Sequence, residues 1–127
     1  MKPIAIFIPL LLIQYIADIL ENSCTSVSGN VLLLIHHIMS IYIFIGGFLY
    51  NPLYHLVFIL LVLLHWTTNN NRCIITGITN KQCGWDFKQP FNDLYAQIGV
   101  SRYISHGKWI LLGILASIDI YKIKYNK

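Results

Sequence analysis

The sequence predicts an all-α integral membrane protein, a single domain of four transmembrane helices with a short amphipathic cap helix. Of the 127 residues, 56% are hydrophobic and only 11% are charged, which is less than half the charged share of an ordinary soluble domain. A soluble chain of this length buries only about two thirds of the surface that it exposes when unfolded, so it could not hide this much apolar surface. The composition therefore excludes a water-soluble enzyme, a disordered regulator and a fibrous repeat.

The basic charges do not indicate a nucleic-acid partner. The formal net charge is +4, but the basic residues are spread along the whole chain and form no basic stripe. Scattered cationic side chains suit the anionic headgroups of a lipid bilayer equally well. We therefore expect lipid, and not nucleic acid, around this chain.

The first expected helix covers residues 3–20, about the length of apolar helix that crosses the hydrocarbon layer. Gln14 and Asp18 interrupt its apolar character. A cleaved signal peptide is the alternative, with Lys2 as its basic start and residues 4–13 as its apolar core, and it would leave three membrane helices. No small-residue cleavage site directly follows the apolar core, which favours a retained helix.

The second and third expected helices form a tight hairpin. Residues 31–50 contain no formal charge and are the strongest membrane segment, and a Ser-Gly-Asn turn at residues 28–30 precedes them. Pro52 suits the first turn of the next helix, where its missing amide would have no partner. This helix covers residues 52–67 and includes Trp66, which fits the aromatic belt at a membrane surface.

Residues 67–107 form a polar stretch that we expect to lie over the bundle as a cap. Within it, residues 90–98 place four apolar side chains on one helical face, which predicts a short amphipathic helix in the headgroup plane. The last expected membrane helix covers residues 108–121 and runs into a tyrosine and a lysine, as an anchored helix should. No linker divides residues 1–127, which we expect to form one domain.

Four spans would place both termini on the same side of the membrane. The lysines near the two ends would then lie together: Lys2, Lys122, Lys124 and Lys127. The positive-inside rule predicts the cytoplasm for that side, although basic residues between 67 and 107 would lie opposite.

All three cysteines fall in the two loops on the other side. In an oxidising compartment, a Cys73–Cys83 disulfide would close a short loop and leave Cys24 unpaired. In a reducing compartment all three would be free thiols. Because the cysteines have no zinc-finger spacing, the sequence predicts no metal site among them.

Ionisable residues within membrane segments tend to face the bundle interior, since exposing them to lipid is costly. The expected topology gathers such residues at two levels, the first with Asp18, His36, His37 and His65 and the second with His55 and Asp119. One interpretation is a functional site: haem b between the second and third helices, a metal, or a proton or quinone site. The other is that one of the adjacent histidines is a hydrogen-bonded core residue, while His55 and His65 lie at the wet interface.

A pattern of residues runs through the middle of the chain: His37, Gly46, Gly47, His55, Cys73, Thr76 and Asn80. Over about residues 31–80, this pattern resembles a bacterial family of small multi-pass membrane proteins that is catalogued as a domain of unknown function. The family has a proline where this chain has Ile74 and an acidic residue where it has Thr79. The resemblance implies a four-helix membrane fold and brings no activity.

The sequence contains no complete catalytic constellation, such as an ordered Ser–His–Asp set, a phosphate-binding glycine loop or a carboxylate pair. The first functional hypothesis is therefore a non-enzymatic protein with a structural or accessory role in a cellular or viral membrane. Its partners would be lipid and other membrane proteins or further copies of itself. Two alternatives stay open. One is a haem- or redox-linked protein using His37 and His65, with Cys73 and Cys83 as a redox pair. The other is a small transporter or proton channel using Asp18 and the histidines.

Overall fold

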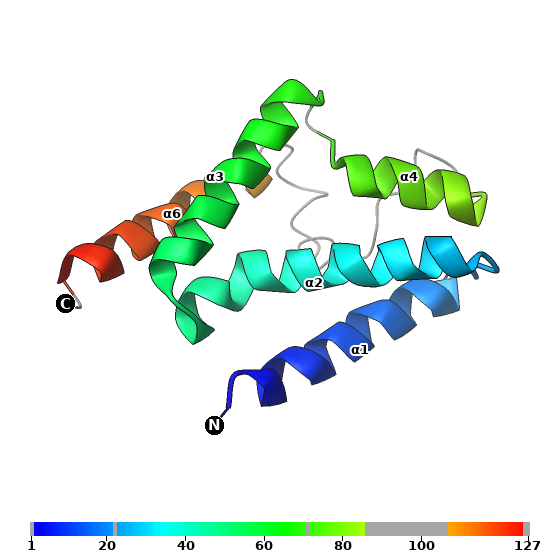
Figure 1. The fold of residues 1–127 in the computed structure, drawn as a ribbon, viewed down its shortest axis with the longest axis horizontal. Coiled ribbons are helices and arrows are strands. Elements are labelled where there is room, and N and C mark those ends of the chain that lie inside the picture. The colour runs from blue at the N-terminus through cyan, green and yellow to red at the C-terminus, as the bar shows by residue number, and fades with distance from the viewer. Residues whose placement is uncertain (1, 22, 71, 86–106, 126–127) are drawn as a thin grey trace.

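The computed structural model describes residues 2–21, 23–70, 72–85 and 107–125. Within these ranges every regular element is an α-helix, which confirms the predicted all-α class. Figure 1 shows the helices, which are α1 (Ile4–Glu21), α2 (Val27–Leu49), α3 (Pro52–Thr68), α4 (Ile74–Cys83) and α6 (Gly107–Tyr125).

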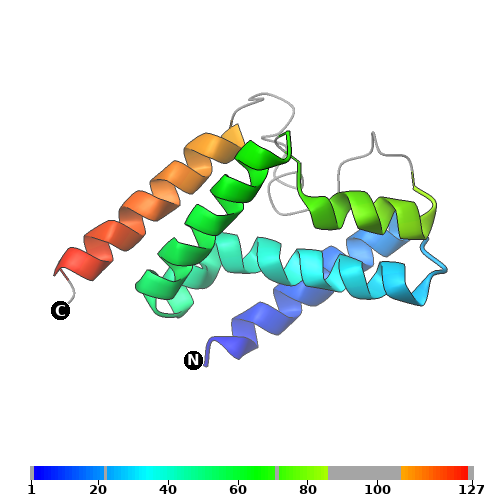
Figure 2. The same ribbon diagram turned by 45° about the horizontal axis from the view of Figure 1, so that its top comes forward.

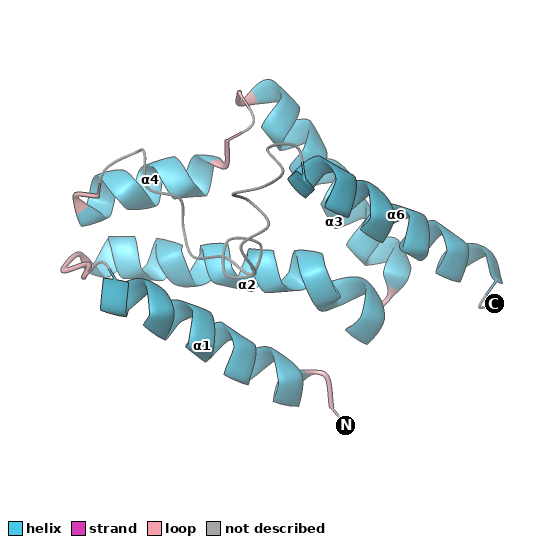
Figure 3. Cartoon of the chain, turned by 180° about the vertical axis from the view of Figure 1, so that it is seen from behind, coloured by secondary structure: helices cyan, strands magenta, loops and turns pink. Residues whose placement is uncertain are grey.

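Helix α2 is the centre of the arrangement and contacts each of the other described helices. Helices α1 and α4 lie along α2, whereas α3 and α6 lie side by side and extend from its C-terminal end (Figure 2). The same two groups are visible from behind (Figure 3). The fold therefore has two halves that share α2.

Side-chain caps mark the residues at which α2 and α3 begin. Helix α2 begins at Val27, because the Ser26 hydroxyl caps it by accepting from Gly29 N at 3.2 Å. The turn predicted at residues 28–30 is therefore wrong, since these residues form the first turn of α2. The expected hairpin is present: Asn51 caps α3 by accepting from Leu53 N at 2.9 Å, and Pro52 occupies the first helical turn.

Among the described helices, α2 alone has both the length and the apolar composition of a membrane span. The apolar part of α1, Ile4–Leu20, and helix α3 are each 17 residues or shorter. At about 1.5 Å per residue they extend about 25 Å, less than the roughly 30 Å hydrocarbon layer. The structure thus agrees with an apolar helical protein and describes one helix long and apolar enough to span a membrane, whereas the four predicted spans are not confirmed.

The predicted polar cap at residues 67–107 contains a helix that the sequence analysis did not expect. Helix α4 covers Ile74–Cys83 and ends at Gly84, whose φ of 69° lies in the left-handed region that glycine adopts readily. Polar residues and an internal glycine dilute its apolar pattern, so periodicity did not reveal it. The amphipathic helix expected at residues 90–98 lies outside the described residues.

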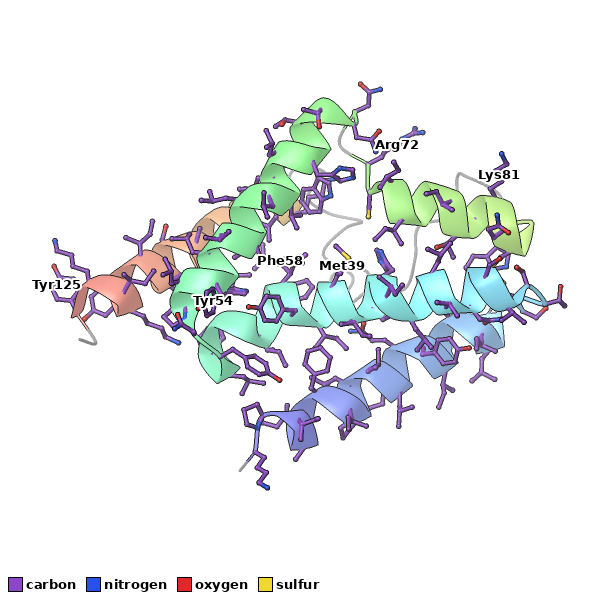
Figure 4. All side chains as sticks on the ribbon, viewed as in Figure 1. Met39, Tyr54, Phe58, Arg72, Lys81 and Tyr125 are labelled. Carbon is purple, nitrogen blue, oxygen red and sulfur yellow. A yellow bond between two sulfur atoms is a disulfide. The ribbon has the colours of Figure 1, made fainter. Side chains whose placement is uncertain are left out.

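Polar side chains occupy much of the interior, and large apolar side chains cover the exterior. The only continuous apolar cluster described joins α3 to α6 and contains Ile59, Val62, Leu112 and Leu115. The buried polar residues of the described chain are more numerous and comprise Gln14, Asp18, His37, Ser40, His55, Thr79, Asn80 and Asp119. Figure 4 shows side chains made of carbon projecting outward along α1 and α3, and examples of the exposed ones are Leu20, Leu61 and Leu64.

Candidate functional site

The first buried polar contact joins α1 to α2. His37 lies in the middle of α2 and is completely buried. Its Nε2 is 2.5 Å from Asp18 Oδ2 and its Nδ1 is 3.1 Å from Gln14 Oε1. Asp18 and Gln14 are four residues apart, so both lie on the face of α1 that meets α2. The structure thus brings together two residues that the sequence analysis placed at one level and adds Gln14 to them.

The Gln14 amide gives His37 two satisfactory hydrogen-bonding states. When Oε1 faces the ring, a hydrogen-bond acceptor lies next to each His37 nitrogen. The His37–Asp18 pair must then hold one proton more than a neutral imidazole beside an ionised carboxylate. With the amide turned over, its NH2 would donate to Nδ1 of a neutral ring. Gln14 Nε2 is buried and has no hydrogen-bond partner among the described residues, so the rotation would break no bond made by Nε2.

The second buried polar contact joins α3 to α6 against α2. His55 Nδ1 is 2.5 Å from Asp119 Oδ2, and both side chains are about 1% exposed. His55 Nε2 donates to the main-chain oxygen of Ile43 at 2.9 Å. A carbonyl can only accept, so this nitrogen must carry a hydrogen and the shared proton lies between Nδ1 and Asp119. The pair is therefore electrically neutral whichever atom holds that proton.

The Gly46–Gly47 pair makes room for this second contact. A Cβ at Gly47 would overlap the Asp119 carboxylate and lie 2.6 Å from His55 Nδ1, and one at Gly46 would lie 2.7 Å from His55 Cδ2. Only glycine allows the backbone of α2 to approach the pair so closely. Lys122, three residues after Asp119, donates to the Gly47 carbonyl at 2.9 Å.

His36 lies beside His37 as expected, whereas His65 has a different position. The ring of His36 lies edge-on to that of His37, with centroids 5.7 Å apart. His65 does not join Asp18 and His37; its Nε2 accepts from Ile74 N at 3.0 Å and caps the start of α4. The expected gathering of His65 with Asp18 and His37 is therefore wrong, because His65 serves the α3–α4 connection. Both ring nitrogens of His37 are engaged, by Asp18 and Gln14, so His37 does not fit a haem held between these two histidines.

The predicted Cys73–Cys83 disulfide is wrong. Cys83 is bonded to Cys24, with a Cα–Cα separation of 4.9 Å, and Cys73 is free. Helix α4 separates Cys73 from Cys83 by ten residues, about 15 Å, whereas a disulfide needs Cα atoms within about 7 Å. Gly29 lies beneath the bond, where a Cβ would be 2.5 Å from Cys83 Sγ.

Further contacts around the disulfide connect α4 to the start of α2. Ser28 donates to Gln82 Oε1 at 3.0 Å, and Trp85 Nε1 donates to the Ser23 carbonyl at 3.2 Å. Together with the disulfide, these hydrogen bonds hold the end of α4 against the start of α2 and the residues before it.

The other residues of the family pattern lie in α4. Asn80 is buried, and its Oδ1 has no partner among the described residues, while Thr76 is half-buried. No three His, Cys, Asp or Glu side chains within the described ranges are placed to bind one metal ion.

Comparison with protein-family models, curated proteins and solved structures finds no match to this chain. The family resemblance therefore stays a prediction.

Sequence reasoning missed two contacts, that of Gln14 with His37 and that of Lys122 with the Gly47 carbonyl. Each carries a spacing signal, since Gln14 lies four residues before Asp18 and Lys122 lies three residues after Asp119. Such spacings place side chains on one helix face. The partners of that face belong to helices distant in sequence, and periodicity does not identify them.

Proposed function

We propose that the chain is an integral membrane protein with a structural or accessory role, built from helices that meet through buried polar side chains. The observation that carries this proposal is the reversed distribution of polarity. Buried polar residues outnumber buried apolar ones in the described part of the chain, while Leu20, Leu61 and Leu64 are among many exposed large apolar side chains. Exposing such an apolar surface to water is unfavourable, whereas contact with the hydrocarbon of a bilayer is favourable.

The His–Asp pairs supply the contacts that membrane helices need. Lipid tails are as apolar as leucine, so the hydrophobic effect does not drive apolar helices to associate in a bilayer. Each pair connects two helices through a hydrogen bond between buried side chains. Both histidines and both aspartates are at most 4% exposed. This favours a structural use of the pairs over a substrate site.

Two features favour one orientation. The Cys24–Cys83 disulfide lies at the N-terminal end of α2 and suits an oxidising compartment. Lys122 and Lys124 lie near the end of α6, which contacts the other end of α2 through Gly47. The positive-inside rule places these lysines in the cytoplasm. The two ends of α2 therefore favour opposite compartments, with the C-terminal end of α6 cytoplasmic.

A membrane extraction experiment tests the main proposal. The full chain would be expressed, and the membrane fraction washed at alkaline pH before treatment with a non-ionic detergent. We expect the chain to stay in the membrane during the wash and to enter solution only with detergent. Release by the alkaline wash would contradict the proposal.

A second candidate function is proton transfer through Asp18 and His37. The Gln14 amide favours it, because the amide can satisfy His37 at two different proton counts. The full chain in phosphatidylcholine vesicles with an internal pH-sensitive dye would test it. We expect flux to be lost in His37→Gln and kept in the control His65→Gln; no flux above that of empty vesicles would exclude the candidate.

A further inference from the structure

The turn between α2 and α3 contains a hollow that holds a lysine. The hollow has a volume of about 380 Å³, and its lining includes Phe48, Tyr50, Asn51, Leu53 and Lys122. A space of this size can take a small polar group such as a phosphodiester with part of its glycerol. It lies beside the His55–Asp119 pair but does not include it.

Two contacts fix the Lys122 ammonium at the hollow. Its Nζ donates to the Gly47 carbonyl at 2.9 Å and lies 4.3 Å from the centroid of the Phe48 ring. An ammonium has three hydrogens to donate. The Gly47 bond uses one of them, so two stay available for oxygen atoms of a ligand.

Lys122 forms no ion pair with an acidic side chain of the described residues. Neither ion pair formed by the described residues includes Lys122. Asp119 is the acid closest to it in sequence, and its carboxylate is engaged by His55 in a neutral pair. The hollow is therefore cationic and suits an anion.

Neutral donors complete the hollow. Asn51 uses its side-chain oxygen to cap α3 by accepting from Leu53 N at 2.9 Å, which leaves its amide nitrogen to donate. Tyr50 also lines the space and carries a hydroxyl. A lysine with an amide and a hydroxyl is a donor set suited to phosphate oxygens.

Tyrosines surround this end of the molecule. Tyr54 at the start of α3 and Tyr125 at the end of α6 lie at the same end in Figure 4, and the exposed set here is Tyr50, Tyr54, Tyr121 and Tyr125. Exposed tyrosines beside lysines mark the depth of lipid headgroups in membrane proteins. The surroundings thus identify lipid as the source of the phosphate.

We propose that the Lys122 hollow binds the phosphodiester headgroup of an anionic phospholipid. Lys122 would contact the phosphate oxygens, with Asn51 and Tyr50 as neutral donors, while Phe48 and Leu53 face the start of the acyl chains. An anionic lipid is favoured over a zwitterionic one, because the choline of the latter would oppose Lys122. This inference rests on the proposed membrane function.

Native mass spectrometry of the full chain tests the site. The protein would be purified in an uncharged detergent, stripped of lipid and titrated with phosphatidylglycerol, with phosphatidylcholine and inorganic phosphate as parallel arms. We expect phosphatidylglycerol to bind about tenfold more tightly than phosphatidylcholine, and Lys122→Gln to lower that affinity about tenfold, as loss of a charge-assisted hydrogen bond would. Lys122→Arg keeps the charge and should keep binding.

The matched control is Lys124→Gln, which removes the same charge two residues away from outside the hollow. We expect it to change the affinity by no more than about twofold. Equal losses in the two glutamine variants, or equal binding of the two lipids, would overturn the proposal. Inorganic phosphate that displaces phosphatidylglycerol at equal affinity would identify a free-anion site and overturn it as well.

Two readouts separate failure of the site from other failures. Retention of the Cys24–Cys83 bond on non-reducing gels and unchanged helical circular dichroism show that a variant is folded. Alkaline extraction tests membrane integration itself. A chain that resists extraction but binds both lipids equally refutes the headgroup site alone, whereas an extracted chain refutes the proposed function.

Discussion

The two buried His–Asp pairs use the same residue types and the same 2.5 Å contact, but the second partner of each histidine differs. For His55 it is the Ile43 carbonyl, which can only accept a hydrogen bond. For His37 it is the Gln14 amide, which can turn to accept or donate. The first pair is therefore able to change its proton count without losing a hydrogen bond, whereas the second pair is not.

Both pairs are buried, but their surroundings differ. His37 and Asp18 join two helices, and Asp18 lies within one turn of the end of α1. His55 and Asp119 join α3 to α6, and the glycines of α2 cover them. A covalent bond supports the half of the molecule with the first pair, since the Cys24–Cys83 disulfide joins α4 to the start of α2. The same side chains thus form an adjustable contact in one half and an enclosed contact in the other.

Removing the carboxylate of each pair gives the largest expected effect. We expect Asp119→Ala to lower the free energy of unfolding by about 3–5 kcal/mol, because it leaves His55 buried without its partner. We expect Asp18→Ala to lower it by about 2 kcal/mol, since water can reach the vacated space at the end of α1. Unfolding by denaturing detergent in mixed micelles measures both. Equal losses would show that the difference in enclosure has no energetic consequence.

Loss of the disulfide should be the next largest effect and should act on one half only. Cys24 and Cys83 are 59 residues apart in sequence, and we expect Cys24→Ser to lower the free energy of unfolding by about 2–4 kcal/mol. The matched control is Cys73→Ser, which removes a free thiol and should change stability by less than about 0.5 kcal/mol. The same unfolding experiment would reveal an incorrect pairing if Cys73→Ser were the more harmful variant.

Gly47→Ala tests the close approach of α2 to the second pair. The added methyl would overlap Asp119 and lie 2.6 Å from His55 Nδ1, so we expect a loss of about 1–3 kcal/mol. At Gly113 a Cβ would meet nothing within 4 Å. Gly113→Ala should therefore be neutral or stabilise the helix by up to about 1 kcal/mol. A comparable loss in both variants would mean that the general effect of replacing glycine explains the result.

Gln14→Leu should have the smallest effect on stability and sharpens the comparison of the pairs. It removes one hydrogen bond to His37 while the contact with Asp18 stays, so we expect a loss of about 1 kcal/mol. Gln82→Leu, which alters an exposed glutamine bonded to Ser28, serves as the control and should cost less than about 0.5 kcal/mol. An identical response of the two glutamines would argue against a special role of Gln14.

Much of the helical architecture follows from local signals in the sequence. The apolar run of α2, the Asn51-Pro52 start of α3 and the shortage of charge all act locally, and each predicted a helix or its boundary. Helix α4 escaped prediction because polar residues and Gly77 obscure its period. The length of each helix was less predictable, since the Ser26 cap extends α2 into residues that read as a turn.

The polar contacts were predictable in part. Depth along the expected helices placed His55 with Asp119 and Asp18 with His37, because antiparallel neighbours bring such positions to one level. Contacts that depend on α4 could not be predicted, because this helix was not expected. Cys83 at its end bonds to Cys24, and His65 caps its start. Once a helix is inserted between Cys73 and Cys83, the short disulfide loop cannot form.

Nitrogen-15 NMR of histidine-labelled full chain in lipid bilayers, recorded for the unsubstituted chain and for Gln14→Leu, tests the difference between the pairs most directly. The spectra report whether each ring nitrogen of His37 and His55 carries a hydrogen. The account predicts that Nε2 of His55 carries a hydrogen in both chains because it donates to the Ile43 carbonyl, while Gln14→Leu changes the Nδ1 signal of His37, which loses its partner. Loss of the His55 Nε2 hydrogen in a folded chain, or identical behaviour of the two rings, would contradict it.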